Sequence, residues 1–534
     1  MLLQHIANRG IRLGTLFERA ARKYPANVIT LDHDLDISPE SGRRLTMRDT
    51  ATLVADLAAR LHTAGVRAGD RVAIYKSPAF DITLLACAVS RIGAVAALLS
   101  PSLDGATVAE LVRRLDRPFL LTDADKLSGV LPTNIGSLCC AVLSANGSST
   151  GAISLQALCG QRPVAPVRVS PSEPTLITHT SGTTGVPKLA IHTGYTFQAR
   201  YRPQAIVARL ARRREPVAIH VSFVHSRMFT AMPIAVLQGH PLVVLAHDDP
   251  LSVAKTFADM PPGLIEAHPN AFLHWEQLAE HPDAPLRNVK YFSSTFDAIH
   301  PRTVQVMLSA SERRSVRFIQ MYGQSEVGPI SGRPYSRRWA ADENGRCVGF
   351  PFPGMTRVRV VARHGKRPSP TSPGDIQVRT DGRIITYLGE DERYTTQQDN
   401  GWWQMGDVGY RTRLGCLHLL DRAVDIIPGI SSTLAIEDAL FARVPALVEV
   451  VLVSGSDGRA VPVVATYDDA PIDAQAWRVA VSDLPPMAEP VHWRFDDLPH
   501  TGTTKVKRLE LARLVSDAAR AGQASEGLDA APIG

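Results

Sequence analysis

The chain has 534 residues, of which 45% are apolar, so it exceeds what one hydrophobic core usually supports and predicts at least two domains. Its 58 basic and 52 acidic residues leave a formal net charge of +6, too small an excess for the basic surface of a nucleic-acid-binding protein. The six cysteines show no Cys-x-x-Cys spacing and the chain starts without a basic segment followed by an apolar one, so we expect a reduced, cytoplasmic protein without a membrane partner.

Helical and strand-like segments alternate through the first part of the chain. Met47–Ala64 has helical periodicity, Arg71–Tyr75 is typical of a strand, and Ile82–Leu99 is typical of a helix that runs into a second short strand. Because Asp81 and Arg91 flank or interrupt the last segment, we expect it to be buried in the core rather than to span a membrane. This alternation predicts parallel βα units.

The same alternation recurs around residues 217–245 and 286–325. Apolar strands are expected at Leu242–Leu245 and Val316–Ile319, each flanked by helical segments. From about residue 346 the pattern changes to short strands and turns. The chain therefore combines an α/β part with a later part of short strands and turns.

A polar loop at residues 178–188 combines hydroxyl groups, two glycines and a lysine. The glycines let the backbone approach a ligand closely, the hydroxyls can donate to phosphate oxygens, and the lysine adds a positive charge. The residues concerned are Thr180, Ser181, Gly182, Thr183, Thr184, Gly185 and Lys188. Pro187 precedes the lysine and Leu189 follows it, so this is not the nucleotide-binding loop that ends in Gly-Lys-Ser/Thr. We predict another kind of polyphosphate loop and an enzyme that uses ATP; the structural alternative is a polar linker between two strands.

This loop resembles the phosphate loop of the adenylate-forming superfamily, which includes acyl- and aryl-CoA synthetases, adenylation domains of peptide synthetases and beetle luciferase. The resemblance continues in order along almost the whole chain. Its further elements are Thr15–Ala21, Leu45–Thr46, Gly69–Val72, Tyr322–Glu326, Gly374–Ile376, Gly406–Gly409, Asp421–Arg422 and Leu498–Lys505. It implies a large α/β N-terminal domain of layered mixed sheets and helices, residues 1–422, followed by a small, mobile α+β C-terminal domain, residues 423–534.

The segment Tyr322-Gly323-Gln324-Ser325-Glu326 resembles the superfamily's Tyr-Gly-x-Thr-Glu element. The resemblance implies that Tyr322 and Gly323 border adenine, that the Ser325 hydroxyl meets the α-phosphate during catalysis, and that Glu326 binds Mg²⁺. Serine in place of threonine keeps the hydroxyl. In isolation the same segment would be a strand that ends in a glycine turn with a solvated glutamate.

Two further elements are expected to hold the nucleotide and to assist the reaction. By resemblance, Asp407 accepts hydrogen bonds from both ribose hydroxyls and Arg422 reaches the ribose or the phosphates. Lys505 resembles the mobile catalytic lysine, which offsets charge between the attacking oxygen and the α-phosphate. Thr504 stands where glycine is usual, and Lys507 offers a second register. The structural alternatives are a surface Gly-Asp turn and a basic surface hairpin.

The acid pocket is expected near His225, where acyl- and aryl-CoA synthetases often place an aromatic-histidine pair. Ser294 and Thr295 are expected beside the nucleotide, and the two residues that follow depart from the superfamily, which usually has glycine and alanine here. In this register Phe296 fills space and Asp297 adds negative charge, which favours a small or amine-bearing substrate.

The loop that usually helps to form the tunnel for the acceptor thiol also departs from the superfamily. Val424 replaces the usual pivot Asp or Lys, Pro428 stands where a lysine is common, and the loop before Glu437 is a few residues shorter. Because proline lacks a backbone N–H and fixes its own φ, we expect free CoA to be a poor acceptor.

Three functions remain open at this point. The first is an ATP- and Mg²⁺-dependent ligase that activates a small or aromatic carboxylic acid as an acyl adenylate, releases pyrophosphate and passes the acyl group to a thiol carrier or an amine. The second, by analogy with the ATP-dependent diazotases of bacterial natural-product pathways, is activation of nitrite to diazotise an arylamine. The third is a nucleotide-binding protein without turnover.

Overall fold

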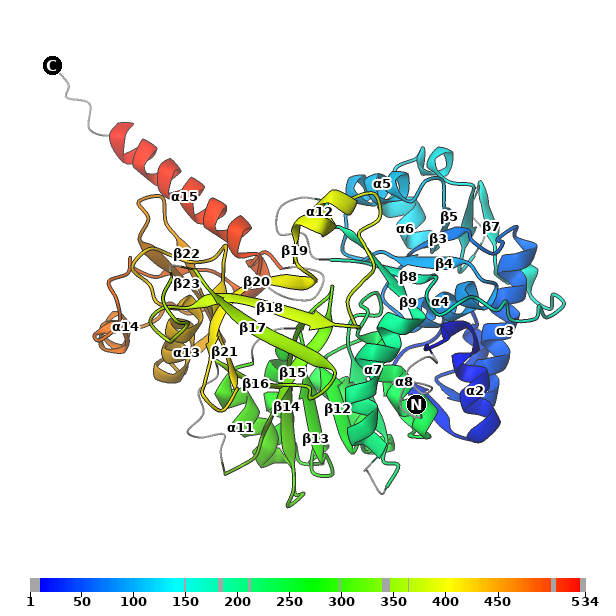
Figure 1. The fold of residues 1–534 in the computed structure, drawn as a ribbon, viewed down its shortest axis with the longest axis horizontal. Helices are drawn as coiled ribbons and strands as arrows, with labels where there is room; N and C mark the ends of the chain where they lie inside the picture. The colour runs from blue at the N-terminus through cyan, green and yellow to red at the C-terminus, as the bar shows by residue number, and fades with distance from the viewer. Residues whose placement is uncertain are drawn as a thin grey trace.

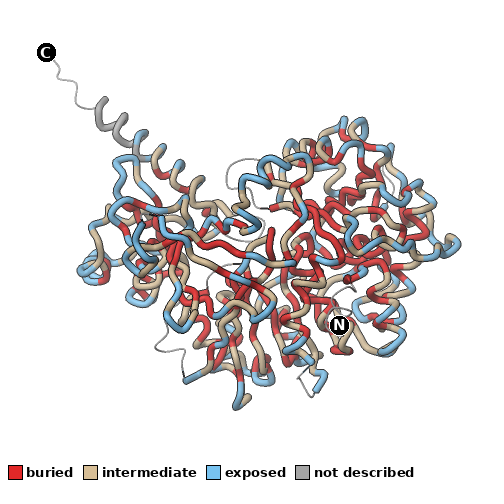
Figure 2. The backbone as a smooth tube through the Cα atoms, viewed as in Figure 1, coloured by how far each residue is buried: buried red, intermediate tan, exposed pale blue. Residues whose placement is uncertain are grey.

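The computed structural model describes residues 10–147, 150–180, 186–209, 213–296, 299–338, 346–363, 365–500 and 506–528. These residues fold into a seven-stranded, a fourteen-stranded and a three-stranded sheet, with helices on their faces (Figure 1). Buried backbone follows the strands, and exposed backbone follows the outer helices and loops (Figure 2). The mixed α/β fold with layered sheets predicted from the sequence is confirmed.

The seven-stranded sheet contains the βα units expected near the N-terminus. Its order is β7 (Ala152–Ser154), β6 (Ala141–Ser144), β5 (Phe119–Thr122), β3 (Arg71–Tyr75), β4 (Val95–Leu98), β8 (Pro174–His179) and β9 (Leu189–Thr193). Neighbours pair in parallel except β8 and β9, which are antiparallel. The loop at residues 180–188 therefore connects the last two strands of this sheet.

Side-chain alternation in β3 shows why this sheet is covered on both faces. Val72 and Ile74 belong to one buried cluster, whereas Ala73 and Tyr75 belong to another, as the two-residue period of a strand requires. The first cluster contains α2 (Leu16–Lys23), α3 (Met47–Thr63), α4 (Asp81–Arg91), α7 (Gly194–Arg209) and α8 (Met228–Gln238). The second contains α5 (Gly105–Arg114), while α6 (Ala124–Gly129) follows β5.

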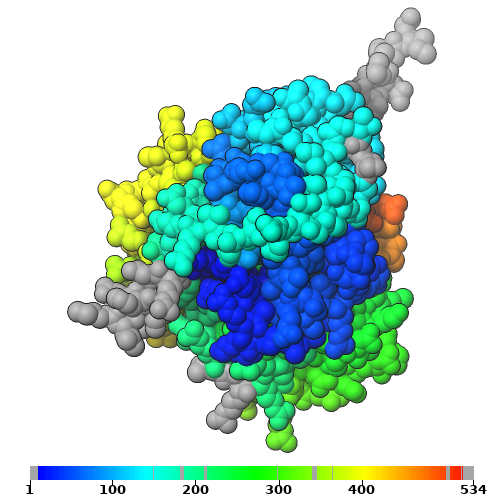
Figure 3. Space-filling view, turned by 90° about the vertical axis from the view of Figure 1, so that its right-hand side faces the viewer, coloured from blue at the N-terminus to red at the C-terminus, as the bar shows by residue number. Residues whose placement is uncertain are grey.

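The expected helix at residues 47–64 and the apolar segment at residues 82–99 are both confirmed, the latter as α4 followed by β4. Thr46 and Asp49 form a reciprocal capping box at the start of α3, which fixes where that helix begins. Among the described residues, no helix is long and apolar enough to cross a membrane. Figure 3 shows the N-terminal segments, in blue, across the middle of this face, with later segments in cyan above them and in green below them.

The large sheet starts with β2 (Arg44–Thr46), β1 (Val28–Leu31) and β11 (Leu242–Val244), and continues through β10 (Val217–His220), β12 (Leu264–Ala267), β13 (Tyr291–Ser294) and β14 (Arg317–Gln324). Leu242 and Val244 face the cluster shared with the first sheet, and Val243 faces a separate cluster. That second cluster contains α9 (Pro250–Asp259), α10 (Pro269–His274) and α11 (Pro301–Ala310). Helices α3, α4, α7 and α8 thus lie between the two sheets, and α9 to α11 cover the far side.

The other end of the large sheet is antiparallel and built from short strands, as expected for the chain after residue 346. The strands are β15 (Gly328–Tyr335), β16 (Cys347–Pro351), β21 (Leu417–Arg422), β20 (Trp402–Arg411), β18 (Gly374–Thr380) and β17 (Thr356–Ala362), with β19 (Gln398–Asp399) beside β20 and α12 (Asp391–Thr396) before it. The expectation that the cysteines are all reduced is wrong here, because Cys347 and Cys416 form a disulfide. The two residues are 69 positions apart, and only the β16–β21 pairing brings them together, so their spacing gave no sign of it.

After Arg422 the chain forms a compact α+β unit at one end of the molecule (Figure 1). It contains α13 (Thr433–Arg443), β22 (Leu447–Ser454), β23 (Ala460–Thr466), α14 (Ala474–Val481), β24 (Val491–His492) and α15 (Arg508–Leu528). Val450 and Leu452 face α13 and α14, whereas Val451 and Val453 face α15. The three-stranded sheet therefore has its own core on both faces.

His300 contacts this unit from the start of α11, and its titration predicts how the stability of the fold depends on pH. Its ring lies 4.8 Å from the Phe441 ring of α13, and its Nδ1 accepts the Arg302 backbone N–H at 3.2 Å, which requires a neutral ring. Burial lowers the pKa of His300 to about 4. Between pH 4 and 6.5 the unfolded chain therefore binds the extra proton, and folding loses stability as pH falls, by up to about 3 kcal/mol.

We expect the melting temperature of the wild-type protein to fall from pH 6.5 to pH 4 more steeply than that of His300→Asn. Asparagine caps a helix without titrating, so it serves as the matched variant. Scanning calorimetry at four or five pH values measures both slopes. Equal slopes would mean that His300 carries no part of the acid sensitivity.

Candidate active site

The predicted phosphate loop joins β8 to β9, and the structure describes its two ends. The Thr180 N–H donates to the Lys188 carbonyl at 3.0 Å, which closes the base of the loop. The Thr180 hydroxyl is buried and has no hydrogen-bond partner among the described residues. Residues 181–185, which include Ser181, Gly182, Thr183, Thr184 and Gly185, lie outside the described residues.

Lys188 and Glu326 meet above this base, together with Tyr387, which the sequence analysis did not identify. The Lys188 ammonium lies 3.4 Å from Glu326 Oε1 and 3.0 Å from the Tyr387 hydroxyl, and 4.4 Å from the centre of the Tyr387 ring. The Tyr387 hydroxyl donates to the same Glu326 oxygen at 2.6 Å. Burial and the charge of Glu326 raise the pKa of Tyr387, so the phenol stays protonated and can donate.

Both described contacts of the Glu326 side chain use Oε1. Its Oε2 is therefore available, among the described residues, to a cation that also binds phosphate oxygens. One carboxylate together with substrate phosphates is the way Mg²⁺ is commonly held. The geometry around Glu326 fits the predicted metal site.

A buried arginine, Arg200 of α7, fixes the turn that carries Ser325 and Glu326. Its guanidinium donates to the carbonyls of Ser325 at 2.9 Å and Gly382 at 2.7 Å, and to the Ser226 hydroxyl at 3.0 Å. Burial lowers the pKa of Arg200 to about 9, and the charge of Glu326 opposes this shift, so the group remains cationic at neutral pH. Arg200 was not predicted as a site residue, because a single arginine on a helix gives no sign of contacts this distant.

Tyr322 of β14 meets Asp407 and Arg422 of the paired strands β20 and β21. The Tyr322 hydroxyl donates to Asp407 Oδ2 at 2.5 Å, and Arg422 Nε lies 3.4 Å from Asp407 Oδ1. Asp407 and Arg422 are direct partners in the β20–β21 pairing. Burial and the charge of Asp407 raise the pKa of Tyr322, which keeps its hydroxyl protonated. The structure thus brings together the three residues predicted to hold adenine and ribose.

Gly323 is required by backbone packing. A Cβ at this position would lie 2.1 Å from the Gly328 carbonyl oxygen of β15, at the irregular point of the β14–β15 pairing. Any side chain here would push the two strands apart. The close approach explains the glycine of the Tyr-Gly element by structure alone, whatever its contact with adenine.

Ser294 ends β13 and Thr295 follows it, and both have buried hydroxyls without a hydrogen-bond partner among the described residues. Together with Thr180 they are three such hydroxyls at strand ends predicted to face the nucleotide. A buried hydroxyl without a partner costs free energy, so a ligand rich in hydrogen-bonding atoms is the expected partner. These residues fit ATP.

His225, Ser325 and Phe296 form the predicted acid side of the site. The Arg227 backbone N–H donates to His225 Nδ1 at 3.0 Å, so the ring proton lies on Nε2, which is 3.2 Å from the Ser325 hydroxyl. The Phe296 ring packs edge-on to His225 at 4.6 Å and against His268 at 4.1 Å.

The backbone of Phe296 has a conformation that favours glycine. Its φ is +87°, in the left-handed region that costs a bulky residue of order 1–3 kcal/mol. Asp297, the next residue and the second departure noted in the sequence, lies outside the described residues.

Lys505 also lies outside the described residues, which resume at Val506. Lys507 is the alternative position for the catalytic lysine. Its backbone N–H donates to the Pro499 carbonyl at 2.7 Å, and its ammonium lies 3.0 Å from Glu510 of α15. Lys507 is therefore engaged at the start of a helix. The assignment of the catalytic lysine to Lys505 stays a prediction.

The loop between β21 and α13 contains the residues that depart from the superfamily pattern. Val424, Ile426 and Pro428 are solvent-exposed, whereas Glu437 is buried and binds the Arg508 guanidinium through both carboxylate oxygens at 2.6 and 2.7 Å. The exposed part carries no lysine, in contrast to the superfamily pattern. That free CoA is a poor acceptor stays a prediction.

Comparison with known proteins gives the same family over most of the chain. A family profile described as AMP-binding enzyme matches residues 17–388. A 3-amino-2-hydroxy-4-methoxybenzoate diazotase from Streptomyces cremeus is 46% identical over 531 residues, covering 95% of this chain and 96% of that protein. A 4-chlorobenzoate–CoA ligase from an Arthrobacter species is 24% identical over 82% of both chains.

Solved structures agree on the fold. The crystal structure of ATP-bound MatB from Rhodopseudomonas palustris superposes with a TM-score of 0.77 at 20% identity, covering 95% of this chain and 99% of that one. With this fold, the assembled site and a profile match over more than half of its length, the chain belongs to the AMP-binding enzyme family and is an adenylate-forming enzyme.

Proposed function

We propose that this enzyme uses ATP and Mg²⁺ to activate nitrite and then converts an arylamine of the aminobenzoate class into its diazonium ion. The relative that is 46% identical is named for diazotisation of such an amine. The observation that carries the proposal is the Phe296 ring, which packs on the same His225 imidazole that contacts Ser325. A ring this close to the expected position of the α-phosphate favours an acid of a few atoms.

In the first step an oxygen of nitrite attacks the α-phosphorus in line with the departing pyrophosphate, so one P–O bond forms and one breaks. Lys188 is proposed to bind the part of ATP that leaves as pyrophosphate, and Lys505 is proposed to offset negative charge on the α-phosphate. Glu326 would hold Mg²⁺, which supplies further positive charge to the phosphates. His225 orients the Ser325 hydroxyl by a hydrogen bond.

In the second step the amine nitrogen attacks the nitrosyl nitrogen, the bond from that nitrogen to the phosphate-bound oxygen breaks, and AMP leaves. The former amine nitrogen then loses both of its protons in turn and the nitroso oxygen takes up two, so the N–O bond breaks, water leaves and the diazonium ion forms. Asp297 is proposed to attract the amine and to accept its proton. Its position directly after Phe296 in the sequence supports this role.

Two assays test the proposal. Isotope exchange between pyrophosphate and ATP should depend on nitrite and be weak with aromatic carboxylic acids alone. With nitrite and an amino-hydroxybenzoate, the product should couple to a naphthol to give a coloured azo compound. Exchange with carboxylic acids but not with nitrite would overturn the proposal.

A carboxylate-activating ligase is the second candidate, favoured by the similarity to a chlorobenzoate–CoA ligase. In that case we expect free CoA to be a weak or non-productive acceptor, because the exposed loop with Val424 and Pro428 lacks the usual lysine. A discharge assay with preformed adenylate compares CoA with aromatic amines. Rapid, saturable thioester formation at micromolar CoA would contradict this expectation.

We also propose that residues 423–534 move as a small domain against residues 1–422 and bring in Lys505. Lys505→Ala should then reduce adenylation by about 100-fold or more while ATP affinity stays nearly unchanged, since a lysine that arrives with domain closure acts mainly in the transition state. Single-turnover adenylation and equilibrium ATP binding measure the two effects. Lys507→Ala is the matched control, and a larger loss in that variant would place the catalytic lysine at 507.

A further inference from the structure

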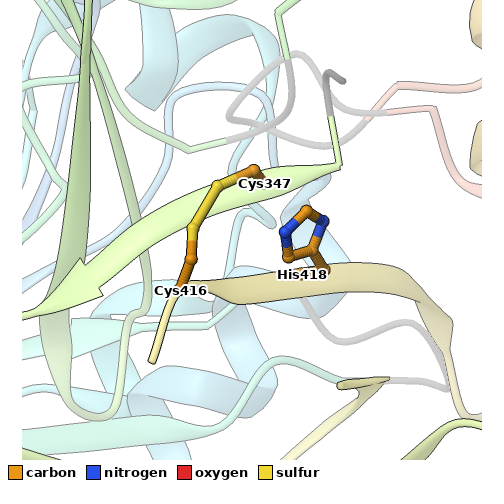
Figure 4. Close-up of side chains that lie close together, drawn as sticks. All are labelled: Cys347, Cys416 and His418. Carbon is orange, nitrogen blue, oxygen red and sulfur yellow. A yellow bond between two sulfur atoms is a disulfide. The ribbon is translucent and has the colours of Figure 1, made fainter. Parts of the chain in front are cut away.

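A cluster of two cysteines and a histidine lies outside the active site, where β16 meets β21. Cys347 opens β16, Cys416 directly precedes β21, and His418 is the β-sheet partner of Cys347. One ligand atom from each residue lies within 4.8 Å of the other two. Figure 4 shows the imidazole beside the bonded sulfur atoms.

His418 presents a nitrogen that the protein does not satisfy. Its Nδ1 is buried and has no hydrogen-bond partner among the described residues. The Tyr410 ring stacks on the imidazole at 4.7 Å with an interplanar angle of 15°, which fixes its orientation.

Reduction of the disulfide frees both sulfurs, and cysteine binds metal ions as the thiolate. Two thiolates and a neutral imidazole carry a charge of −2, which a divalent cation neutralises.

We propose that, in the reduced protein, Cys347, Cys416 and His418 bind one Zn²⁺ ion, with water in the fourth position. Zinc prefers sulfur and nitrogen ligands, and three protein ligands with one open position are a common arrangement. The Cα atoms of the cysteines are 6.9 Å apart, at the wide limit for a disulfide. Two thiolates on one tetrahedral ion stand roughly 3.7 Å apart, which suits such a wide pair.

The disulfide and the zinc site use the same two sulfurs and therefore exclude each other. Oxidised glutathione would take two electrons from the zinc-bound thiolates: the protein disulfide forms, glutathione leaves as two thiolates, and Zn²⁺ is released. Either crosslink joins β16 to β21, the strand that ends at Arg422.

The test uses the reduced, full-length protein freed of metal with a chelator. Zn²⁺ is titrated in competition with a chromophoric chelator, and Co²⁺ serves as a spectroscopic probe of thiolate ligands. We expect one equivalent of tight binding and a thiolate-to-cobalt charge-transfer band. Cys416→Ser and His418→Ala should each weaken zinc binding by about tenfold or more.

Cys140→Ser is the matched control, because Cys140 is an exposed free cysteine outside the cluster. It should keep the stoichiometry and the cobalt band, and pretreatment of the wild type with oxidised glutathione should abolish both. Circular dichroism and ATP binding establish that each variant is folded. Absence of stoichiometric zinc binding by the reduced wild type, or binding that survives in Cys416→Ser and is lost in Cys140→Ser, would overturn the proposal.

Discussion

Replacing Glu326 by glutamine is expected to reduce the rate of adenylate formation by about 100-fold or more and to raise the Mg²⁺ concentration needed for half-maximal rate. The glutamate carboxylate accepts from Tyr387 and lies beside Lys188 through Oε1, which leaves Oε2 for the cation among the described residues. Glutamine keeps the shape of the side chain but removes the charge. Pyrophosphate exchange over a range of Mg²⁺ concentrations measures both effects.

Tyr387→Phe is the control that separates the charge of Glu326 from its orientation. It removes one hydrogen bond at 2.6 Å and keeps the carboxylate. The loss of rate should not exceed about 10- to 100-fold, because one hydrogen bond to a charged group contributes about 1.5–3 kcal/mol. The Mg²⁺ requirement should change little, since the carboxylate remains, and this separates the variant from Glu326→Gln. If Glu326→Gln leaves the Mg²⁺ dependence unchanged, the metal is held by other residues.

The strand and helix pattern was predictable where side chains repeat with a clear period. The strand at Arg71–Tyr75 and the helix at Met47–Ala64 were placed to within one residue, because one alternates between two buried faces and the other begins at a capping box. The strand predicted at Val316–Ile319 begins at Arg317 but runs on to Gln324. Periodicity does not set its end, since glycine and tyrosine continue the pairing with β15.

The candidate site was predictable where its residues lie in ordered motifs. Tyr322, Asp407 and Arg422 were chosen from three separate segments, and the structure joins them by contacts of 2.5 and 3.4 Å. Arg200 and Tyr387 were not predicted, because each acts through contacts with distant segments: Arg200 lies 125 positions from Ser325, and Tyr387 lies 199 positions from Lys188. The Cys347–Cys416 pair was missed for the same reason: strand pairing, not sequence spacing, decides which residues meet.

Phe296 offers the largest expected change in substrate choice. Phe296→Gly should increase pyrophosphate exchange with aromatic carboxylic acids relative to nitrite by on the order of 100-fold, the range over which pocket size alone discriminates between substrates. The ring that packs on His225 at 4.6 Å and on His268 at 4.1 Å is removed, so a substrate side chain can take its place. Exchange assays with nitrite, benzoate and aminobenzoates give the ratio.

Phe296→Ala separates the effect of space from the effect of backbone strain. Both variants remove the ring, but alanine keeps a Cβ at a φ of +87°, which only glycine adopts without cost. If the ring excludes larger acids, both variants should accept them. The free energy of unfolding of Phe296→Gly should exceed that of Phe296→Ala by about 1 kcal/mol. Phe296→Leu retains bulk and should keep the preference for nitrite. An unchanged ratio of nitrite to carboxylate exchange in both the glycine and the alanine variant would show that Phe296 does not limit the size of the acid. The preference for nitrite would then arise from other residues of the pocket.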